Sequence, residues 1–435
     1  MASHSDSTPT RIPFRTLPAP GALFAGLLVA ALLAGVVALV LLSGADHERM
    51  WRGIHFNWIF WSGMSMGLVM LNCVHQVTNA RWAGMIRRFS LAGVAFLPIS
   101  FVLFLVDMFG GREVLFHHWL HPAAHDAVLE AKSGWLNWGS LITRDIIGLI
   151  VLYGLAIYYT YLTLRPDVYG AGQTDGQKRW YGWLTRGFRG VTEEAERSQR
   201  LRTRVAPIMG LLFAFIWSML AIDMAMSMLP HWFSTMFPVT FFMGSFHAAL
   251  AMNALMVVIF RKQLGLEDFI GRQHFHDMGK MIFAFAVFWM YINWSQYVVI
   301  WYGLLPHEQE FFVQRFQPPF GGITQLMVIC TFVAPFLGLL FRSAKKASGV
   351  LAAVAIVVLI GHWLDRFLIT VPSIYEGETL PLGLPEIGLA LGFAALWFGC
   401  YTWFLRTFPV LPSPASLAAV PQATIELPAN AQPGF

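Results

Sequence analysis

Ionisable side chains interrupt several long apolar segments of this 435-residue chain. A charged group costs about 2.5–3.5 kcal/mol at hydrocarbon depth on insertion scales, so it is expected to pair or to face a polar path. A histidine titrates near neutral pH and can exchange a proton with a carboxylate. The chemistry that these positions support is therefore proton transfer or the binding of a polar head group. The seven candidate residues are Arg144, Asp145, Asp223, His247, His362, Asp365 and Arg366.

Arg144 and Asp145 are adjacent in one apolar segment, and Asp223 lies in the next. Neighbouring residues on a helix point about 100° apart, so Arg144 and Asp145 do not simply pair with each other. We expect Arg144 to pair with Asp223, because both lie in the outer half of their helices. Two interpretations stay open at this point: a structural salt bridge that locks two helices, or a proton relay or quinone head-group site.

The segment GHWLDRF places His362 three residues before Asp365 and four before Arg366, so all three share one helix face. His247 lies near the middle of another apolar segment. We interpret these four residues as a proton relay or coupling site, with a purely structural polar network as the alternative. A further alternative is a single haem clamped by His247 and His362.

Other polar residues near segment ends predict ordinary interfacial roles. His55 and His75 lie near opposite ends of segment 54–76, and Asp107 lies near the end of segment 87–110, so we expect all three to meet solvent. The three cysteines sit singly inside apolar segments and form no CxxC or Cys/His cluster. We expect them to pack as small apolar side chains that build no iron–sulfur or zinc site.

Composition predicts an integral membrane protein. Hydrophobic residues make up 57% of the chain and charged residues 12%, whereas about a quarter of the residues of soluble domains are charged. Crossing a bilayer takes about 20 apolar residues in a helix. The predicted fold is all-α, with about ten transmembrane helices between residues 19 and 407. The predicted helices are 20–43, 54–76, 87–110, 135–163, 205–228, 236–260, 275–301, 319–341, 349–371 and 386–407.

The order of the helices predicts two four-helix bundles, one from about 54 to 228 and one from about 236 to 371, with a flanking helix on either side. Residues 1–18 and 408–435 are predicted to be disordered tails. Of the 29 Lys and Arg residues, 22 fall on the side of both termini and five on the opposite side. This bias predicts a multi-pass protein with both termini cytoplasmic. The basic residues thus reflect topology, and no nucleic-acid partner is expected.

Four stretches between the fourth and ninth predicted helices suggest a family. They are HP…K…WLNWGSLITRD (121–145), SMLPHWFSTMFPVTFFMGSF (227–246), FHDMGKMIFAFAVFWMYINWSQYVVIWYGLLP (275–306) and GHWLDRFLITVPS (361–373). Together with NARWAGMIRR (79–88), they resemble the F subunit of bacterial alternative complex III, within the superfamily of polysulfide-reductase-type membrane anchors. The resemblance covers about residues 50–375 and is weak in both tails and in the loop 164–204.

The resemblance implies a subunit of a quinol:electron-acceptor oxidoreductase in the bacterial cytoplasmic (inner) membrane. It implies no redox cofactor in this chain, with haems and iron–sulfur clusters held by partners. The implied partners are the lipid bilayer, a homologous sister membrane subunit, an iron–sulfur subunit and a multihaem cytochrome subunit. Quinone or quinol binding, or a proton path for energy coupling, is the role that such a subunit would have.

The chain departs from the family pattern at its outer face. An acid usually precedes Pro-His-Trp, but Leu229 stands here, and the loop after 275–301 reads Gly-Leu-Leu-Pro-His-Glu where Gly-Asn-aliphatic-Pro-Glu-Glu is usual. An outer proton exit that relied on those polar groups is therefore in doubt. Two other functions stay open: an assembly anchor whose charges only hold helices together, and a stand-alone secondary transporter, which would show broken helices in two inverted halves.

Overall fold

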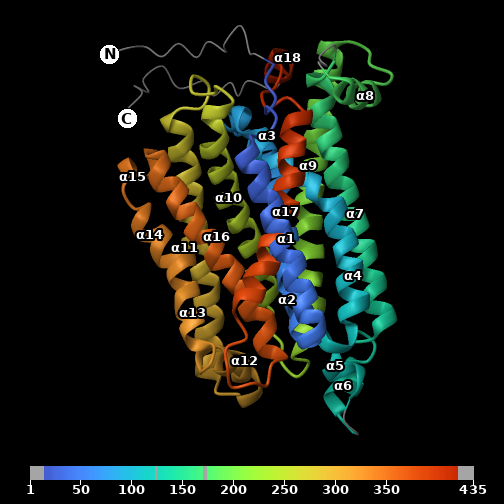
Figure 1. Cartoon of the computed structure of the whole chain (residues 1–435), viewed down its shortest axis with the longest axis vertical. Helices are drawn as coiled ribbons and strands as arrows, with labels where there is room; N and C mark the ends of the chain where they lie inside the picture. Colours follow the sequence, from blue (N-terminus) through green and yellow to red (C-terminus); the bar gives the residue numbers. More distant parts are fainter. Residues whose placement is uncertain (1–13, 123–124, 170–173, 420–435) are drawn as a thin grey trace, which may run out of the picture.

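The computed structural model describes residues 14–122, 125–169 and 174–419, and helix is the only regular structure that it contains there. Ten long helical segments run side by side (Figure 1). Their order and number confirm the predicted all-α integral membrane fold. The long segments are α1 (Ala22–Ala45), α2 (His47–Val77), α3 and α4 (Arg87–Leu91 and Leu97–Leu115, joined by a 3₁₀ turn), α7 (Trp138–Leu164), α9 (Val191–Met224), α10 (Phe237–Gln263), α11 (Arg272–Gly303), α13 and α14 (Gly321–Val328 and Ala334–Gly338, joined by a π turn), α16 (Ser348–Thr370) and α17 (Leu384–Thr407).

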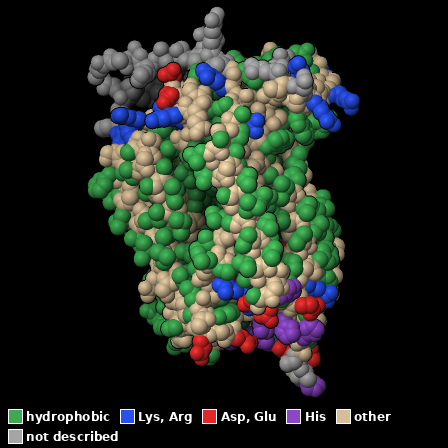
Figure 2. All heavy atoms as spheres, viewed as in Figure 1, with side chains coloured by type: hydrophobic (Ala, Val, Ile, Leu, Met, Phe, Trp, Pro, Cys, Tyr) green, Lys and Arg blue, Asp and Glu red, His purple; other side chains and the backbone are tan. Residues whose placement is uncertain are grey.

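Short helices cap the two ends of this bundle (Figure 1). The end where α8 (Asp175–Leu184), α15 (Arg342–Lys346) and α18 (Pro414–Ala418) lie is called the α8 end below. The other is called the α12 end and carries α5 (His117–Leu120), α6 (Ala127–Lys132) and α12 (Pro306–Phe316). Figure 2 shows Lys and Arg side chains concentrated at the α8 end, Asp, Glu and His concentrated at the α12 end, and a largely hydrophobic surface between them.

Within the described residues, nine of the long helices are apolar and long enough to cross a membrane. The tenth, α2, is more polar and begins with His47, Glu48 and Arg49. It lies at the centre of the protein, where it packs against α1, α4, α9, α10, α16 and α17. A helix surrounded by other helices does not need a lipid-compatible surface, which explains how α2 accommodates polar side chains.

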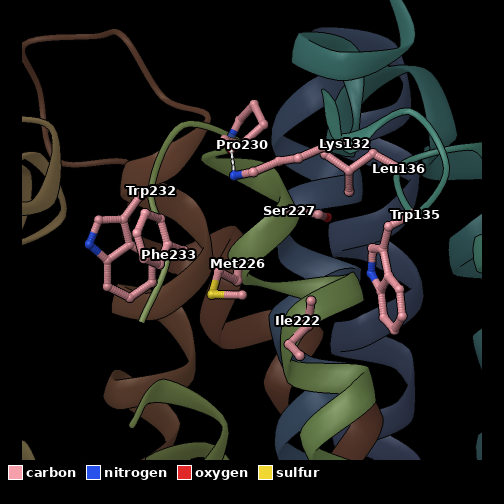
Figure 3. A pocket seen from close by; sticks show the side chains of 9 residues that line it. All are labelled: Lys132, Trp135, Leu136, Ile222, Met226, Ser227, Pro230, Trp232 and Phe233. Carbon is pink, nitrogen blue, oxygen red and sulfur yellow. Dashed lines mark hydrogen bonds between the residues drawn. The ribbon is translucent and has the colours of Figure 1, made fainter. Parts of the chain in front are cut away.

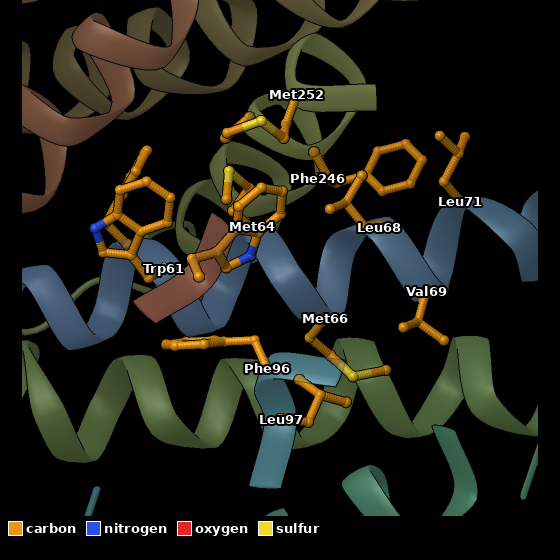
Figure 4. Packing of buried hydrophobic residues seen from close by; sticks show 14 of the residues in the cluster. Trp61, Met64, Met66, Leu68, Val69, Leu71, Phe96, Leu97, Phe246 and Met252 are labelled. Carbon is orange, nitrogen blue, oxygen red and sulfur yellow. The ribbon is translucent and has the colours of Figure 1, made fainter. Parts of the chain in front are cut away.

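The two predicted four-helix groups are present in the packing. In the first, α2 contacts α4 and α9, and α7 contacts α9 and α4. In the second, α10 contacts α11 and α16, while α13 and α14 pack on α16. Contacts of α2 and α9 with α10 join the groups. Figure 4 shows this junction, where Met64 and Leu68 of α2 lie close to Phe246 of α10.

The flanking helices α1 and α17 pack against each other at two glycines. A Cβ atom on Gly35 of α1 would lie 2.6 Å from the Cα of Gly392 in α17. Only glycine at both positions allows the two backbones to approach this closely. Most other residues of α1 are exposed, so this contact is the principal attachment of α1 to the rest of the protein.

The packed part of the chain extends beyond the predicted tail boundaries at 18 and 408. The Leu17 N–H donates to the Leu405 carbonyl at 2.9 Å, and the Val410 N–H donates to the Arg15 carbonyl at 2.8 Å. Val410 is buried, and α18 follows it. Residues 14–18 and 408–419 are therefore held against the α8 end, contrary to the prediction. The remaining parts of both predicted tails lie outside the described residues.

Candidate functional site

The seven candidate residues lie in the half of the bundle nearer the α12 end, in two clusters. The first cluster comes from α7 and α9 and contains Arg144, Asp145 and Asp223. The second comes from α10 and α16 and contains His247, His362, Asp365 and Arg366. Central helix α2 packs against α9, α10 and α16, so it contacts helices of both clusters. The seven residues thus form two sites rather than one.

Arg144 and Asp223 form the ion pair that the sequence predicted. Arg144 Nε lies 2.6 Å from Asp223 Oδ2, and Nη2 lies 2.6 Å from Oδ1, which is the two-pronged geometry that makes Arg–carboxylate pairs strong. Trp135 covers the pair: its indole N–H donates to Asp223 Oδ1 at 2.8 Å, and the Arg144 guanidinium sits 4.1 Å from its ring centroid. The Arg144 side chain is 16% exposed, whereas Asp223 is fully buried.

Asp145 is the unsatisfied member of the first cluster. It is fully buried, and no donor from a described residue reaches its carboxyl oxygens. The carboxyl lies beside that of Asp223 and within electrostatic range of Arg144. If both acids were ionised, one negative charge would be unbalanced in a buried environment. One proton shared between the two carboxyls would leave the trio without net charge.

His55 and Asp107 form a buried pair that the sequence analysis placed wrongly at the membrane surface. His55 Nδ1 lies 2.7 Å from Asp107 Oδ2, and both side chains are fully buried. The cause is helix length: α2 begins at His47 rather than 54, and α4 continues to Leu115 rather than 110. The other ring nitrogen, Nε2, lies 2.8 Å from the Met224 carbonyl, so the pair sits directly beside the first cluster.

His75, at the α8 end of α2, is buried as well, and the prediction of a solvated residue was wrong there too. Its ring packs edge-on against Trp82 at 5.1 Å between centroids.

His247 and His362 meet between α10 and α16. His362 Nε2 lies 2.9 Å from His247 Nδ1, and the rings stand at 85° with centroids 4.9 Å apart. Both histidines are fully buried. An iron held by both would need its own space between these two nitrogens, which already lie at hydrogen-bond distance. The geometry therefore fits a histidine pair that can pass a proton and does not fit the haem alternative.

Arg366 and Asp365 complete the second cluster. Arg366 Nη2 donates to the Phe241 carbonyl of α10 at 2.9 Å, and its guanidinium lies 4.5 Å from the Phe241 ring centroid. Arg366 Nε lies 3.7 Å from Asp365 Oδ2. Asp365 therefore lies beside Arg366, whereas His362 forms a hydrogen bond with His247 of α10.

Arg315 of α12 is one of the five basic residues that the sequence predicts on the side opposite the termini, outside the apolar segments, and it lies close to the second cluster. It is buried, and its Nη2 donates to Ser373 Oγ at 2.7 Å. Burial lowers the pKa of Arg315 well below its ordinary value, and the charge of Asp365 opposes that shift. Hydropathy could not predict the burial of Arg315, because it places this residue outside the apolar segments. The side chain is buried because α12 folds back over the end of α16.

Hydroxyl and indole groups lie between the clusters and toward the bundle centre. Ser245 of α10 accepts from the Trp217 indole of α9 at 3.1 Å and lies 3.5 Å from Arg366 Nη2. Near α2, Ser62 Oγ lies 2.6 Å from Ser100 Oγ, which lies 3.0 Å from the Tyr153 hydroxyl. These groups extend the polar region of the first bundle toward the middle of the membrane-spanning helices.

A pocket of about 310 Å³ opens at the α12 end beside the first cluster (Figure 3). Its walls include Trp135, which also bonds Asp223, and Trp232 and Phe233 from the segment before α10. Lys132 Nζ donates to the Pro230 carbonyl at 2.6 Å across the pocket. Burial lowers the pKa of Lys132, and the nearby Asp126 carboxylate opposes that shift. The pocket suits an apolar or aromatic group, and its occupant would touch the residue that covers the Arg144–Asp223 pair.

A scan against protein-family models finds no match for this chain, and a search of curated proteins finds no similar sequence. The class that fold and composition define is an all-α, multi-pass integral membrane protein. Assignment to a particular family therefore depends on the sequence motifs described above and belongs to the proposal that follows.

Proposed function

We propose that this chain is a membrane subunit of a quinol:electron-acceptor oxidoreductase of the alternative complex III type, and that it contributes a proton path. The observation that carries the proton path is the Asp145–Asp223–Arg144 trio with the adjoining His55–Asp107 pair. A proton path needs buried titratable groups that can share a proton. It also needs a connection to the surface, which the partly exposed Arg144 provides. The motif resemblance supports membership of the complex.

In this proposal the protein sits in the bacterial inner membrane with both termini cytoplasmic. The α8 end then faces the cytoplasm and the α12 end faces outward. Both clusters lie in the outer half, so they serve proton release rather than uptake. Quinol oxidation beside a homologous sister subunit would change the local field, which would shift the proton between Asp145 and Asp223. Haems and iron–sulfur clusters belong to the partner subunits.

A specific observation favours the alternative, a structural anchor without a proton path. The Asp223 carboxylate accepts three hydrogen bonds, two from Arg144 and one from the Trp135 indole. A carboxylate so fully satisfied is typical of a lock between helices. Asp145 distinguishes the two functions, because a structural lock has no use for a second, unsatisfied carboxyl at the same place.

Purification through an affinity tag on this chain tests membership of the complex. We expect a multihaem cytochrome, visible by its haem absorption, and an iron–sulfur subunit to co-purify with quinol-oxidising activity. A tagged, unrelated membrane protein from the same cells is the control. A chain that purifies alone as a stable species, without haem absorption or activity, would refute the proposal and favour the transporter alternative.

A further inference from the structure

Three buried side chains surround Gly244 of α10, and each has a nitrogen without a partner among the described residues. They are Trp289 of α11 and His362 and Arg366 of α16, and all three are at least nine-tenths buried. The unpartnered atoms are Trp289 Nε1, His362 Nδ1 and Arg366 Nη1, whereas the other terminal nitrogen of Arg366, Nη2, donates to the Phe241 carbonyl. Leaving one buried donor unsatisfied costs about 1–3 kcal/mol. Three such atoms on neighbouring side chains indicate a shared hydrogen-bond partner.

The three side chains converge on one point. A Cβ atom placed on Gly244 would lie 2.6 Å from Arg366 Nη2, 3.4 Å from Trp289 Nε1 and 3.5 Å from His362 Nδ1. The Trp289 and His362 rings stand at 90° to each other, with centroids 5.7 Å apart. Because Gly244 has no side chain, no side-chain atom of α10 lies between these three groups.

We propose that an ordered water molecule is bound here, held by Trp289 Nε1, His362 Nδ1 and Arg366 Nη1. Water fits the donor set. The indole and guanidinium N–H groups can only donate, and one water accepts two hydrogen bonds. The water can then donate to His362 Nδ1 when the Nε2 of the same ring carries the proton shared with His247. Buried waters typically make about three hydrogen bonds of this kind.

Charge favours water over an anion. Asp365 already lies 3.7 Å from the Arg366 guanidinium and supplies its counter-charge. A second negative ion would compete with that carboxylate. A water adds no charge and still satisfies the three nitrogens.

The site deepens the proposed function and rests on it. The hydrogen bonds of the described residues join His247 to His362, but none joins His362 to Arg366 or Asp365. A water bound by both His362 and Arg366 makes that connection. Of the three groups that hold the water, only His362 exchanges a proton with it, because the indole and the guanidinium stay protonated. The water therefore couples the histidine pair to the Arg366 and Asp365 charges through a hydrogen bond.

A density map of the purified protein, with whatever subunits accompany it, tests the site at a resolution that shows other buried waters. We expect a peak about 2.7–3.2 Å from the three nitrogens. We also expect the peak to persist in protein prepared in chloride-free gluconate buffer. Gly244→Ala should abolish it, because the new methyl group displaces the Arg366 guanidinium. Gly399→Ala in α17, where an added Cβ meets nothing within 4 Å, is the matched control.

Trp289→Phe keeps an aromatic ring but removes the pyrrole ring with its N–H donor, so it tests the site even if Gly244→Ala does not fold. We expect the peak to weaken or move in this variant, with a lowered melting temperature because buried ring atoms are lost, but with one cooperative unfolding transition. No peak in the unsubstituted protein, or a peak lost in gluconate buffer, overturns the water site. Either result leaves the co-purification test untouched, so failure of this inference and failure of the proposed function are distinguishable.

Discussion

At the scale of single residues, Asp145 and Asp223 differ sharply although their carboxyls are neighbours. Asp223 accepts from Arg144 and Trp135, whereas Asp145 accepts from no described residue. Asp223→Asn should lower the free energy of unfolding by about 3–5 kcal/mol, because it removes the carboxylate that holds the largely buried Arg144 guanidinium with two hydrogen bonds. Asp145→Asn should leave stability unchanged or raise it, since it removes a competing acid. Thermal unfolding in detergent measures both variants, and equal losses would contradict the shared-proton interpretation.

The sequence was sufficient to pair Arg144 with Asp223, because both are costly at membrane depth and lie at similar heights on adjacent helices. It also selected His247 and His362 for the same reason. It failed for His55 and Asp107, whose burial depends on where α2 and α4 end. Polar and charged residues extend both helices past the apolar segments, so hydropathy alone places these two residues at the surface.

At the scale of helices, the attachment of α1 depends on close approach at Gly35 and Gly392. Gly392→Leu should force α1 away from α17 and destabilise the protein by about 1–3 kcal/mol, as overpacking does. Gly399→Leu is the matched control: it adds the same side chain to the same helix, at a position where an added Cβ meets nothing within 4 Å. Limited proteolysis at Asp46, which alone separates α1 from α2, reports the detachment. Equal cleavage of the two variants would contradict the attachment.

Helix number was predictable and helix length was not. Each apolar segment became a helix, because a bilayer-spanning backbone must satisfy its own hydrogen bonds. The start of α9 shows the difficulty: it lies at Val191 rather than 205, because the charged residues between these positions continue the helix beyond the apolar segment. The short helices at both ends, such as α6 and α12, contain no long apolar run and gave no signal.

At the scale of the whole molecule, the surface charge is uneven between the two ends (Figure 2). The excess of Lys and Arg at the α8 end predicts that this end is cytoplasmic. We expect Arg186→Cys, at the α8 end, to react with a membrane-impermeant thiol reagent only in inverted vesicles. Glu376→Cys, in the loop between α16 and α17 at the α12 end, should react in intact spheroplasts. Both native side chains are exposed. The reverse labelling pattern would invert the topology and make the two clusters inward-facing.

Both clusters lie in the half of the molecule nearer the α12 end, and the central claim is that their residues conduct protons. The number of protons translocated per electron, measured in vesicles that contain the assembled complex, tests this claim most directly. Glu113→Gln is the matched control, because Glu113 is an exposed acid at the same end, with a side chain that is 62% exposed. With normal assembly and electron transfer, Asp223→Asn and Asp365→Asn should lower the ratio well below that of the control. Ratios equal to the control in both variants would show that the buried charges only hold helices together.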